Sequence, residues 1–193
     1  MKRCAFFLMV LFLTALTTEA PVVHAGDAPQ VTLKGKPLTL LGEPLQVGKT
    51  LPAVRLPDRS LNMIDLASLK GKVTILSVVP SLDTPTCEEQ THILSEKNDG
   101  LDQTVNLVTI SRDLPFAQKR FAKGAKIENI LFLSDYREAD FGLAAGLLID
   151  ESRLLARAVM VLDREGIIRY LEIVPELAQL PNMQKAFEVA RSL

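Results

Sequence analysis

The sequence has few of the residues on which several classes of function depend. It contains no tryptophan and two tyrosines, and its 22 basic residues are balanced by 23 acidic ones, for a net charge of −1. Binding to nucleic acid relies on a basic surface and often on aromatic stacking, and the composition offers neither. Two cysteines and two histidines are too few for a disulfide scaffold or for a zinc site built from Cys and His.

Several common short motifs are absent as well. The sequence contains no CxxC pair, no glycine-rich phosphate loop and no GxSxG element. These absences argue against self-contained disulfide exchange, nucleotide binding through such a loop and serine-hydrolase chemistry. With 48% hydrophobic and 23% charged residues over 193 positions, the chain has the composition of one folded domain with extensions.

The N-terminal segment has the pattern of a secretory signal peptide. Lys2 and Arg3 precede an apolar run over residues 4–16, and Val23 and Ala25 fit a signal peptidase site. We predict a signal peptide over residues 1–25, a folded domain over residues 26–193, and an exported protein, periplasmic in a Gram-negative organism, with no membrane contact after cleavage. The alternative is an uncleaved anchor, although the run is shorter than the roughly 20 residues that a spanning helix needs.

The rest of the chain alternates between predicted strands and helices. The apolar pattern predicts strands at residues 31–33, 37–40, 53–56, 73–79, 105–110, 130–133, 158–162 and 167–174, and helices at residues 84–95, 113–121, 138–145 and 183–192. Residues 63–69 are predicted to form a helical turn, and Asp113 to cap the helix that follows it. Helices between strands indicate parallel pairing at the centre of the sheet, and residues 158–174 form an antiparallel hairpin. This order is typical of a thioredoxin-like α/β fold, a mixed sheet flanked by helices, here with an N-terminal β-hairpin extension.

The candidate chemistry lies around Cys87. Cleavage after Ala25 would leave Cys87 as the single cysteine and His92 as the single histidine. Cys87 is expected in the first turn of a helix, where the helix dipole and free N–H groups favour a thiolate. His92, five residues on, lies about 500° around the helix axis and projects from another face. The alternative is a buried structural cysteine.

Two neighbouring features bear on this site. Thr84 stands three residues before Cys87, where a hydroxyl can serve as a helix cap, as a hydrogen-bonding group beside the sulfur, or as both. Taken alone, Arg157 and Arg137 would be ordinary surface arginines.

Three separated segments resemble the thiol peroxidase subfamily of the peroxiredoxins. They are residues 80–87 (Pro-Ser-Leu-Asp-Thr-Pro-Thr-Cys), residues 111–118 (Ser-Arg-Asp-Leu-Pro-Phe-Ala-Gln) and residues 155–159 (Leu-Ala-Arg-Ala-Val). The resemblance runs from about Val31 to the C-terminus. It implies a homodimer that acts on hydroperoxides without metal, haem or flavin.

The resemblance also assigns roles to individual residues. Cys87 is similar to the peroxidatic cysteine, which attacks the O–O bond and becomes a sulfenic acid. Thr84 resembles the threonine that hydrogen-bonds thiolate and peroxide, and Arg157 the arginine that stabilises the negative charge. Pro80 resembles the proline that shields the pocket, and Arg137 a second arginine near the substrate.

One position departs from the family pattern. Ala122 stands where thiol peroxidases usually have a resolving cysteine, so an internal disulfide cannot form in the domain. We therefore expect an external thiol or a thioredoxin-like reductant to reduce the sulfenic acid. The resulting hypothesis is an exported one-cysteine peroxidase for hydrogen peroxide and small organic hydroperoxides. The alternatives are a thioredoxin-like redox-sensing or binding module without efficient turnover and, less favoured without a second cysteine, disulfide exchange with client proteins.

Overall fold

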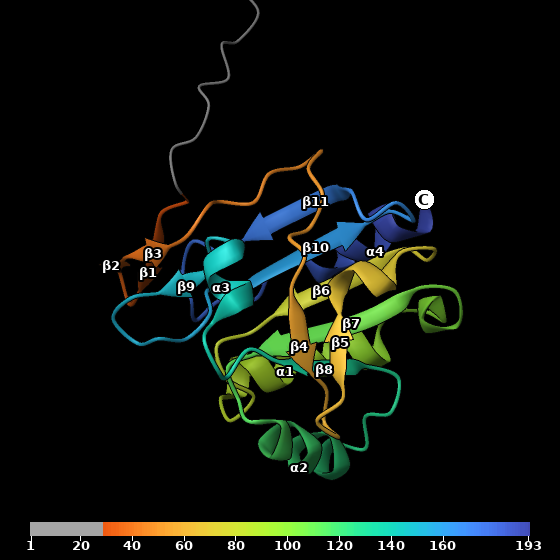
Figure 1. The fold of residues 1–193 in the computed structure, drawn as a ribbon, viewed down its shortest axis with the longest axis horizontal. Helices are drawn as coiled ribbons and strands as arrows, with labels where there is room; N and C mark the ends of the chain where they lie inside the picture. The colour runs from red at the N-terminus through yellow and green to blue at the C-terminus, as the bar shows by residue number, and fades with distance from the viewer. Residues whose placement is uncertain (1–28) are drawn as a thin grey trace, which may run out of the picture.

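The computed structural model describes residues 29–193, and the signal peptide predicted over residues 1–25 lies outside them. Within residues 29–193, no helix combines the length and the apolar character needed to cross a membrane. The described chain is built around one central sheet, with helices behind it and smaller strands in front of it in the view of Figure 1.

The central sheet has five strands in the order β11-β10-β6-β7-β8. β6, β7 and β8 run parallel, whereas β10 pairs antiparallel with both β6 and β11. Their bounds are Thr74–Val78 for β6, Asn106–Ser111 for β7, Leu131–Ser134 for β8, Ala158–Leu162 for β10 and Ile168–Ile173 for β11. The predicted mixed sheet is confirmed, although β10 lies inside it and only β11 forms that edge.

β6 is central because its sequence suits burial on both faces. All five of its residues are buried, and a strand covered on both sides reads as a nearly continuous apolar run. Val78, its last residue, pairs with Ala158 of β10 on one side and with Ile110 of β7 on the other. The chain that leaves β6 therefore starts from a fixed point between two neighbouring strands.

Three helices cover one face of the sheet. They are α1 (Pro85–Glu96), α2 (Pro115–Ala125) and α4 (Met183–Arg191). Right-handed crossovers from β6 to β7 and from β7 to β8 put α1 and α2 on the same side. Their buried side chains share one hydrophobic cluster with those of α4, and this cluster includes Cys87, Leu94, Ala122 and Phe187.

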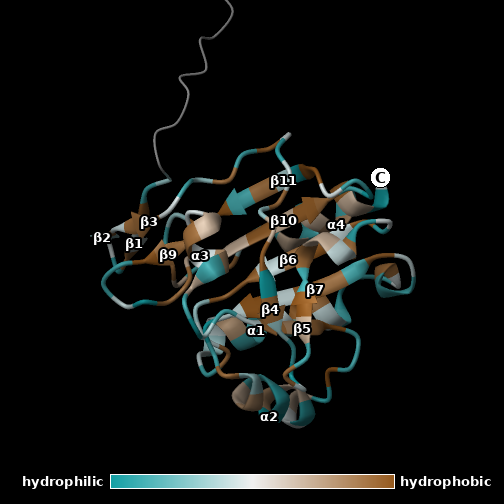
Figure 2. Cartoon of the chain, in the orientation of Figure 1, coloured by the Kyte–Doolittle hydropathy of each residue, from teal (hydrophilic) through white to brown (hydrophobic). Residues whose placement is uncertain are grey.

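Short elements cover the other face. They are β4 (Arg55–Pro57), β5 (Met63–Asp65), the 3₁₀ helix η1 (Leu66–Leu69), α3 (Asp140–Ala144) and β9 (Leu148–Ile149). Figure 2 shows hydrophobic residues gathered on the central strands and hydrophilic residues on the connecting loops.

The prediction of a helical turn over residues 63–69 is wrong for its first half. Residues 63–65 form β5, because Ile64 pairs with Leu56 of β4. The helical part begins only at Leu66, after the Asp65 carboxylate accepts a hydrogen bond from the Ala67 N–H.

The N-terminal hairpin is confirmed, with β1 at Val31–Leu33 and β2 at Lys36–Leu38. The following β3 (Leu40–Leu41) pairs with β9, which the sequence did not predict, and η2 spans Leu101–Gln103. Glu176 holds the hairpin turn, since its carboxylate accepts from the N–H groups of Lys34 and Gly35 at 3.0 and 3.1 Å. These bonds, led by the one from Gly35, lower the pKa of Glu176 to about 2.

Candidate active site

Cys87 lies in the first turn of α1, just beyond the carboxyl end of β6. Pro80, which follows β6, is buried and has no N–H to extend the strand ladder. The chain then turns, Thr84 takes the N-cap position with extended backbone angles, and Pro85 begins the helix. Cys87 is a free cysteine with none of its surface exposed. Its sulfur is thus held where the N-terminal dipoles of a helix favour negative charge.

Arg157, the residue before β10, donates directly to this sulfur. Its Nη2 lies 3.3 Å from Cys87 Sγ, its Nη1 donates to Gln90 Oε1 at 2.8 Å, and its Nε donates to the Leu177 carbonyl at 2.9 Å. The side chain is buried, and no carboxylate of the described chain forms an ion pair with it. The interpretation of Arg157 as a surface arginine is therefore wrong. Its positive charge faces the sulfur without an acid to neutralise it.

Gln90 fixes the orientation of Arg157. It is fully buried, and its Nε2 donates to Ser77 Oγ at 2.8 Å and to the Ala158 carbonyl at 3.3 Å. These bonds leave Gln90 Oε1 facing the guanidinium. The sequence reasoning missed this residue. The available signal was its position one turn after Cys87, because a polar side chain on the buried face of a helix needs a partner.

Asp113 holds the loop that leads into α1. Its carboxylate accepts from Ser81 Oγ at 2.7 Å and from the Leu82 N–H at 2.8 Å. The prediction that Asp113 caps α2 is wrong, since Leu114 occupies the N-cap position and makes no side-chain cap bond. The Asp113 carboxylate is already used across the loop.

Thr84 lies in the loop that follows Pro80 and leads into α1. The Thr84 hydroxyl donates to the Ser81 carbonyl at 3.1 Å, and the Cys87 N–H donates to the Thr84 carbonyl at 3.1 Å. Thr84 thus takes the N-cap position without a side-chain cap bond, and its side chain is exposed at the loop. No hydrogen bond joins its hydroxyl to Cys87 within residues 29–193.

No hydrogen bond in the described chain joins Arg137 to Cys87. The Arg137 side chain is exposed in the turn between β8 and α3, where its Nε donates to Tyr136 Oη at 3.0 Å and its guanidinium lies over the Tyr136 ring. The hydrogen bond to Tyr136 is the main reason that the pKa of Arg137 is raised. A role for Arg137 toward substrate therefore stays a prediction. Ala122 is buried in α2, in the hydrophobic cluster that contains Cys87.

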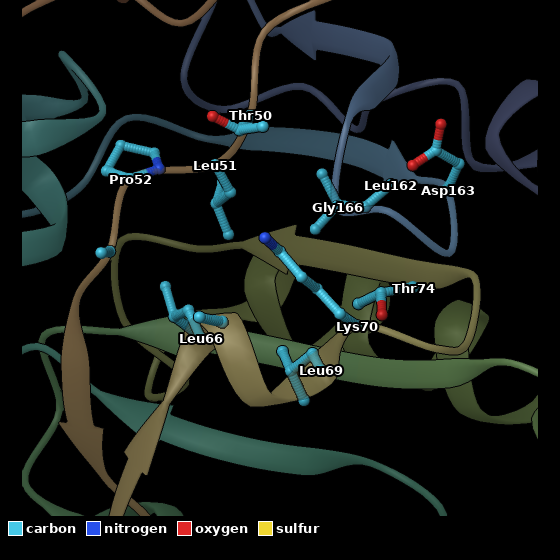
Figure 3. Close-up of a pocket in the computed structure, with 12 residues that line it drawn as sticks. Thr50, Leu51, Pro52, Leu66, Leu69, Lys70, Thr74, Leu162, Asp163 and Gly166 are labelled. Atoms are coloured by element: carbon cyan, nitrogen blue, oxygen red, sulfur yellow. The ribbon is translucent and has the colours of Figure 1, made fainter.

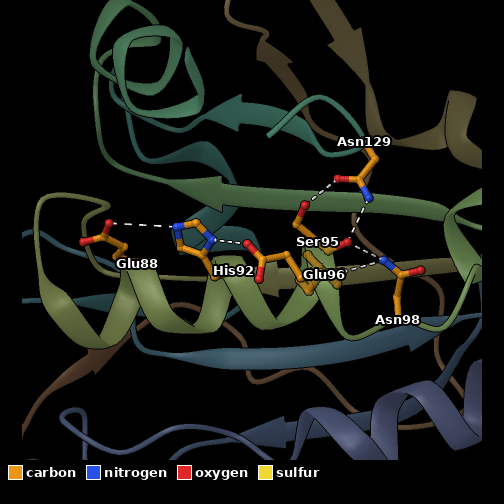
Figure 4. Close-up of polar contacts among 7 residues, drawn as sticks. Glu88, His92, Ser95, Glu96, Asn98 and Asn129 are labelled. Carbon is orange, nitrogen blue, oxygen red and sulfur yellow. Dashed lines mark hydrogen bonds and ion pairs between the residues drawn. The ribbon is translucent and has the colours of Figure 1, made fainter. Parts of the chain in front are cut away.

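His92 faces away from the sulfur, as predicted. Figure 4 shows its ring between two carboxylates on the outer side of α1, with Nδ1 2.7 Å from Glu96 Oε1 and Nε2 3.9 Å from Glu88 Oε1. Cys87, on the inner side of the same helix, is buried. No base–thiol pair therefore forms between His92 and Cys87.

The structure also has a cavity that lies apart from Cys87 and Arg157. A cavity of about 310 Å³ is lined by Leu51, Leu66, Lys70 and Leu162 among others, and the Lys70 side chain reaches into it (Figure 3). It also borders Thr74, the first residue of β6, so it lies at the strand end opposite to the one that leads to Cys87. No group of three His, Cys, Asp or Glu side chains in the described chain could hold a metal ion.

The arrangement suits a nucleophilic sulfur that passes negative charge to a leaving group. A buried cation and helix N–H groups stabilise charge best when they are fixed in place before it develops. Here Arg157 is held by Gln90 and the Leu177 carbonyl, so its third donor stays directed at Cys87.

Comparison with known proteins agrees with this geometry. The family model described as Redoxin matches residues 46–187. A thiol peroxidase from Bacillus subtilis is 45% identical over 164 residues, which cover 85% of this chain and 98% of that protein. A thiol peroxidase from Listeria innocua is 44% identical over 162 residues, 84% of this chain and 98% of the relative.

Among solved structures, a peroxiredoxin-like protein from Aquifex aeolicus has a TM-score of 0.79 and 37% identity, covering 86% of this chain and 97% of its own. A thiol peroxidase from Chromobacterium violaceum has the same fold, with a TM-score of 0.74 and 21% identity over 86% of this chain and 97% of its own. The chain belongs to the redoxin family and, within it, to the thiol peroxidases of the peroxiredoxin group.

Proposed function

We propose that this chain reduces hydrogen peroxide and small organic hydroperoxides at Cys87 and depends on an external thiol to complete the cycle. The chain is a thiol-dependent peroxidase. The observation that carries the proposal is the 3.3 Å contact between Arg157 Nη2 and the buried Cys87 sulfur in the first turn of α1. No other cysteine lies within residues 29–193.

In the first half of the cycle, the Cys87 thiolate attacks one oxygen of the peroxide. The S–O bond forms as the O–O bond breaks, the sulfur is oxidised by two electrons, and the departing oxygen takes up a proton and leaves as water or an alcohol. Arg157 stabilises the thiolate and the developing charge on oxygen. We assign to the Thr84 hydroxyl, whose proton is donated to the Ser81 carbonyl, the role of accepting a hydrogen bond from the peroxide, and to Pro80 the shielding of the sulfur from solvent.

In the second half, a thiol from outside must attack the Cys87 sulfenic acid. This attack releases water and leaves a mixed disulfide, and a second thiol then restores the Cys87 thiol and leaves as the oxidised disulfide. Ala122 supports this route, because the buried position that the family resemblance assigns to a resolving cysteine has no sulfur in this chain. A small thiol or a thioredoxin-like protein would serve as reductant.

Two further properties belong to the proposal. The large apolar side chains of Leu114 and Phe116 are 50% and 62% exposed beside Asp113, and such a patch suits the subunit contact of a homodimer. Sedimentation of Phe116→Glu, expected as a monomer, tests this contact.

The apolar segment at residues 4–16 supports export, which N-terminal sequencing of the secreted or periplasmic protein would test.

Stopped-flow oxidation tests the activity itself. The full chain in a Cys4→Ser background has Cys87 as its single thiol, and thiol loss on mixing with hydrogen peroxide or cumene hydroperoxide gives a second-order rate constant. We expect a rate constant far above that of free cysteine, and no reaction in the further variant Cys87→Ser. A rate constant equal to that of free cysteine would refute the enzyme and favour a sensing or binding module.

A further inference from the structure

The peroxide chemistry leaves one cavity of the molecule without a role. This cavity has a volume of about 310 Å³, and its lining includes Thr74 at the start of β6 and Leu162 at the end of β10. Cys87 follows the opposite end of β6. Sites for small molecules are usually cavities of about 300–1,000 Å³ with mostly apolar walls and a few polar groups. The cavity therefore has the size of a separate small-molecule site.

The walls of the cavity are mostly apolar and belong to the hydrophobic core. Leu66 and Leu162 are 4% and 3% exposed and lie in the main core cluster, and the partly buried Leu51 and Leu69 pack against that cluster. An apolar group that enters the cavity would contact these side chains and lose its contact with water. Such burial is the main source of affinity for an apolar ligand.

The main chain holds the cavity open. Two of the segments around it are hydrogen-bonded to the turn between β10 and β11. The Leu51 N–H donates to the Gly166 carbonyl at 3.2 Å, and the Gly71 N–H, just after η1, donates to the Arg164 carbonyl at 2.8 Å. Because the walls are already in place, a ligand would not have to order them when it binds.

Lys70 brings a positive charge into this apolar cavity. A Cβ at Gly166 would lie 3.1 Å from Lys70 Cε and 3.4 Å from its Cγ, so the lysine stem packs over this glycine. Figure 3 shows the amine directed into the cavity. Lys70 forms no ion pair within residues 29–193. The acid in the lining, Asp163, is already engaged by the Ile167 N–H at 2.9 Å and by Arg169 Nε at 2.6 Å.

We propose that this cavity binds a small carboxylic acid, whose carboxylate pairs with Lys70 and whose apolar body lies against Leu66 and Leu162. A water-sized group takes up about 30 Å³, so the cavity has room for about ten non-hydrogen atoms, or an acid of about eight carbons. An anionic head group would gain a charge-assisted hydrogen bond that a neutral one cannot match. The site lies away from Cys87 and does not rest on the function proposed above.

The test is an NMR titration of the ¹⁵N-labelled full chain, read at the amides of Leu51, Gly71 and Gly166. The probes are octanoate, 1-octanol and octylammonium, which share an apolar chain and differ in the head group. We expect octanoate to bind with a Kd of about 1 mM or tighter. We expect 1-octanol to bind about fivefold more weakly and octylammonium more weakly still, because neither pairs with Lys70.

Variants separate the charge from the apolar walls. Lys70→Met keeps the length of the side chain and removes its charge, so it should weaken octanoate by about fivefold or more and leave 1-octanol unchanged. Ala67→Phe adds a large group to the lining and should weaken both probes. Lys72→Met is the matched control, since Lys72 is exposed nearby but does not line the cavity, and it should bind octanoate as the parent does.

Four results would overturn the proposal. Octanoate could cause no saturable shift at these amides up to about 10 mM, or 1-octanol could bind as tightly as octanoate. Octanoate affinities within twofold of each other in Lys70→Met and the parent would show that Lys70 does not hold the carboxylate. Finally, octanoate should leave the rate of Cys87 oxidation unchanged, and a slower rate would place the acid at Cys87 instead.

Discussion

Replacing Arg157 with lysine tests the central contact of the site. The guanidinium satisfies three acceptors at once, namely the Leu177 carbonyl, Gln90 Oε1 and Cys87 Sγ. A lysine ammonium keeps the charge but lacks the planar fork that reaches all three. Arg157→Lys therefore separates the presence of a cation from its direction.

The expected losses follow from the contacts. A buried acceptor left without a donor costs about 1–3 kcal/mol, so losing one or two of them should lower the free energy of unfolding by about 1–6 kcal/mol. A misdirected donor at a site of developing charge costs about 10²–10³ in rate. We expect the second-order rate constant for Cys87 oxidation to fall by about 10²-fold.

Stopped-flow thiol loss in the Cys4→Ser background gives the rate constant, and urea denaturation followed by circular dichroism gives the free energy of unfolding. Arg153→Lys is the matched control, since Arg153 is exposed and pairs with Asp150 at 3.3 Å on the surface; both measurements should match the parent. A rate constant for Arg157→Lys within threefold of the parent would refute the argument that the direction of the Arg157 donor matters.

Three more predictions address other parts of the molecule. Gln90→Leu should slow oxidation by about tenfold, because Arg157 loses the acceptor that orients it; an unchanged stopped-flow rate would contradict this. Ala122→Cys should form an internal disulfide with Cys87 after peroxide, seen by mass spectrometry as the loss of two hydrogens, and its absence would show that the two positions cannot meet. The pKa of Glu176, lowered from 4.5 to about 2, means that its stabilisation of the hairpin is full above pH 4.5 and is lost as the pH falls toward 2. In Glu176→Gln, hydrogen exchange at the Gly35 N–H, corrected for its intrinsic rate, should therefore be faster than in the parent already at pH 6. Equal protection in the variant and the parent would contradict the role of Glu176 in holding the hairpin turn.

Local patterns predicted the elements that carry the site. The β-branched run of β6, the proline that follows it and the Thr84-Pro85 start of α1 are all readable from neighbouring residues, and the structure places them as expected. Strands such as β5 and β9, of three and two residues, have too short a pattern of their own. They form because a partner strand lies beside them, which a local pattern does not record.

The contacts within the site were less accessible to sequence reasoning. Arg157 is far from Cys87 in the sequence, so its place beside the sulfur came from family resemblance and not from spacing. Gln90 and Asp113 were missed as site residues because their partners come from other strands and loops. Asp113 in particular precedes a helix, where an acidic residue usually caps, and only the folded chain shows its bonds to the loop.

The pairing of β6 with β10 implies that the site tolerates substitutions better than insertions or deletions. Val78 and Ala158 are direct partners in the sheet. Val78 ends the strand that leads to Cys87, and Ala158 immediately follows Arg157. Because strand side chains alternate between faces, adding or removing one residue in β10 would send Arg157 to the opposite side of the sheet. The same change in β6 would displace the segment that leads to Cys87 relative to Arg157. Changes of side-chain identity along these strands leave that alternation intact. Variation in the lengths of β6 and β10 should therefore be far rarer among functional variants of this chain than variation in their composition.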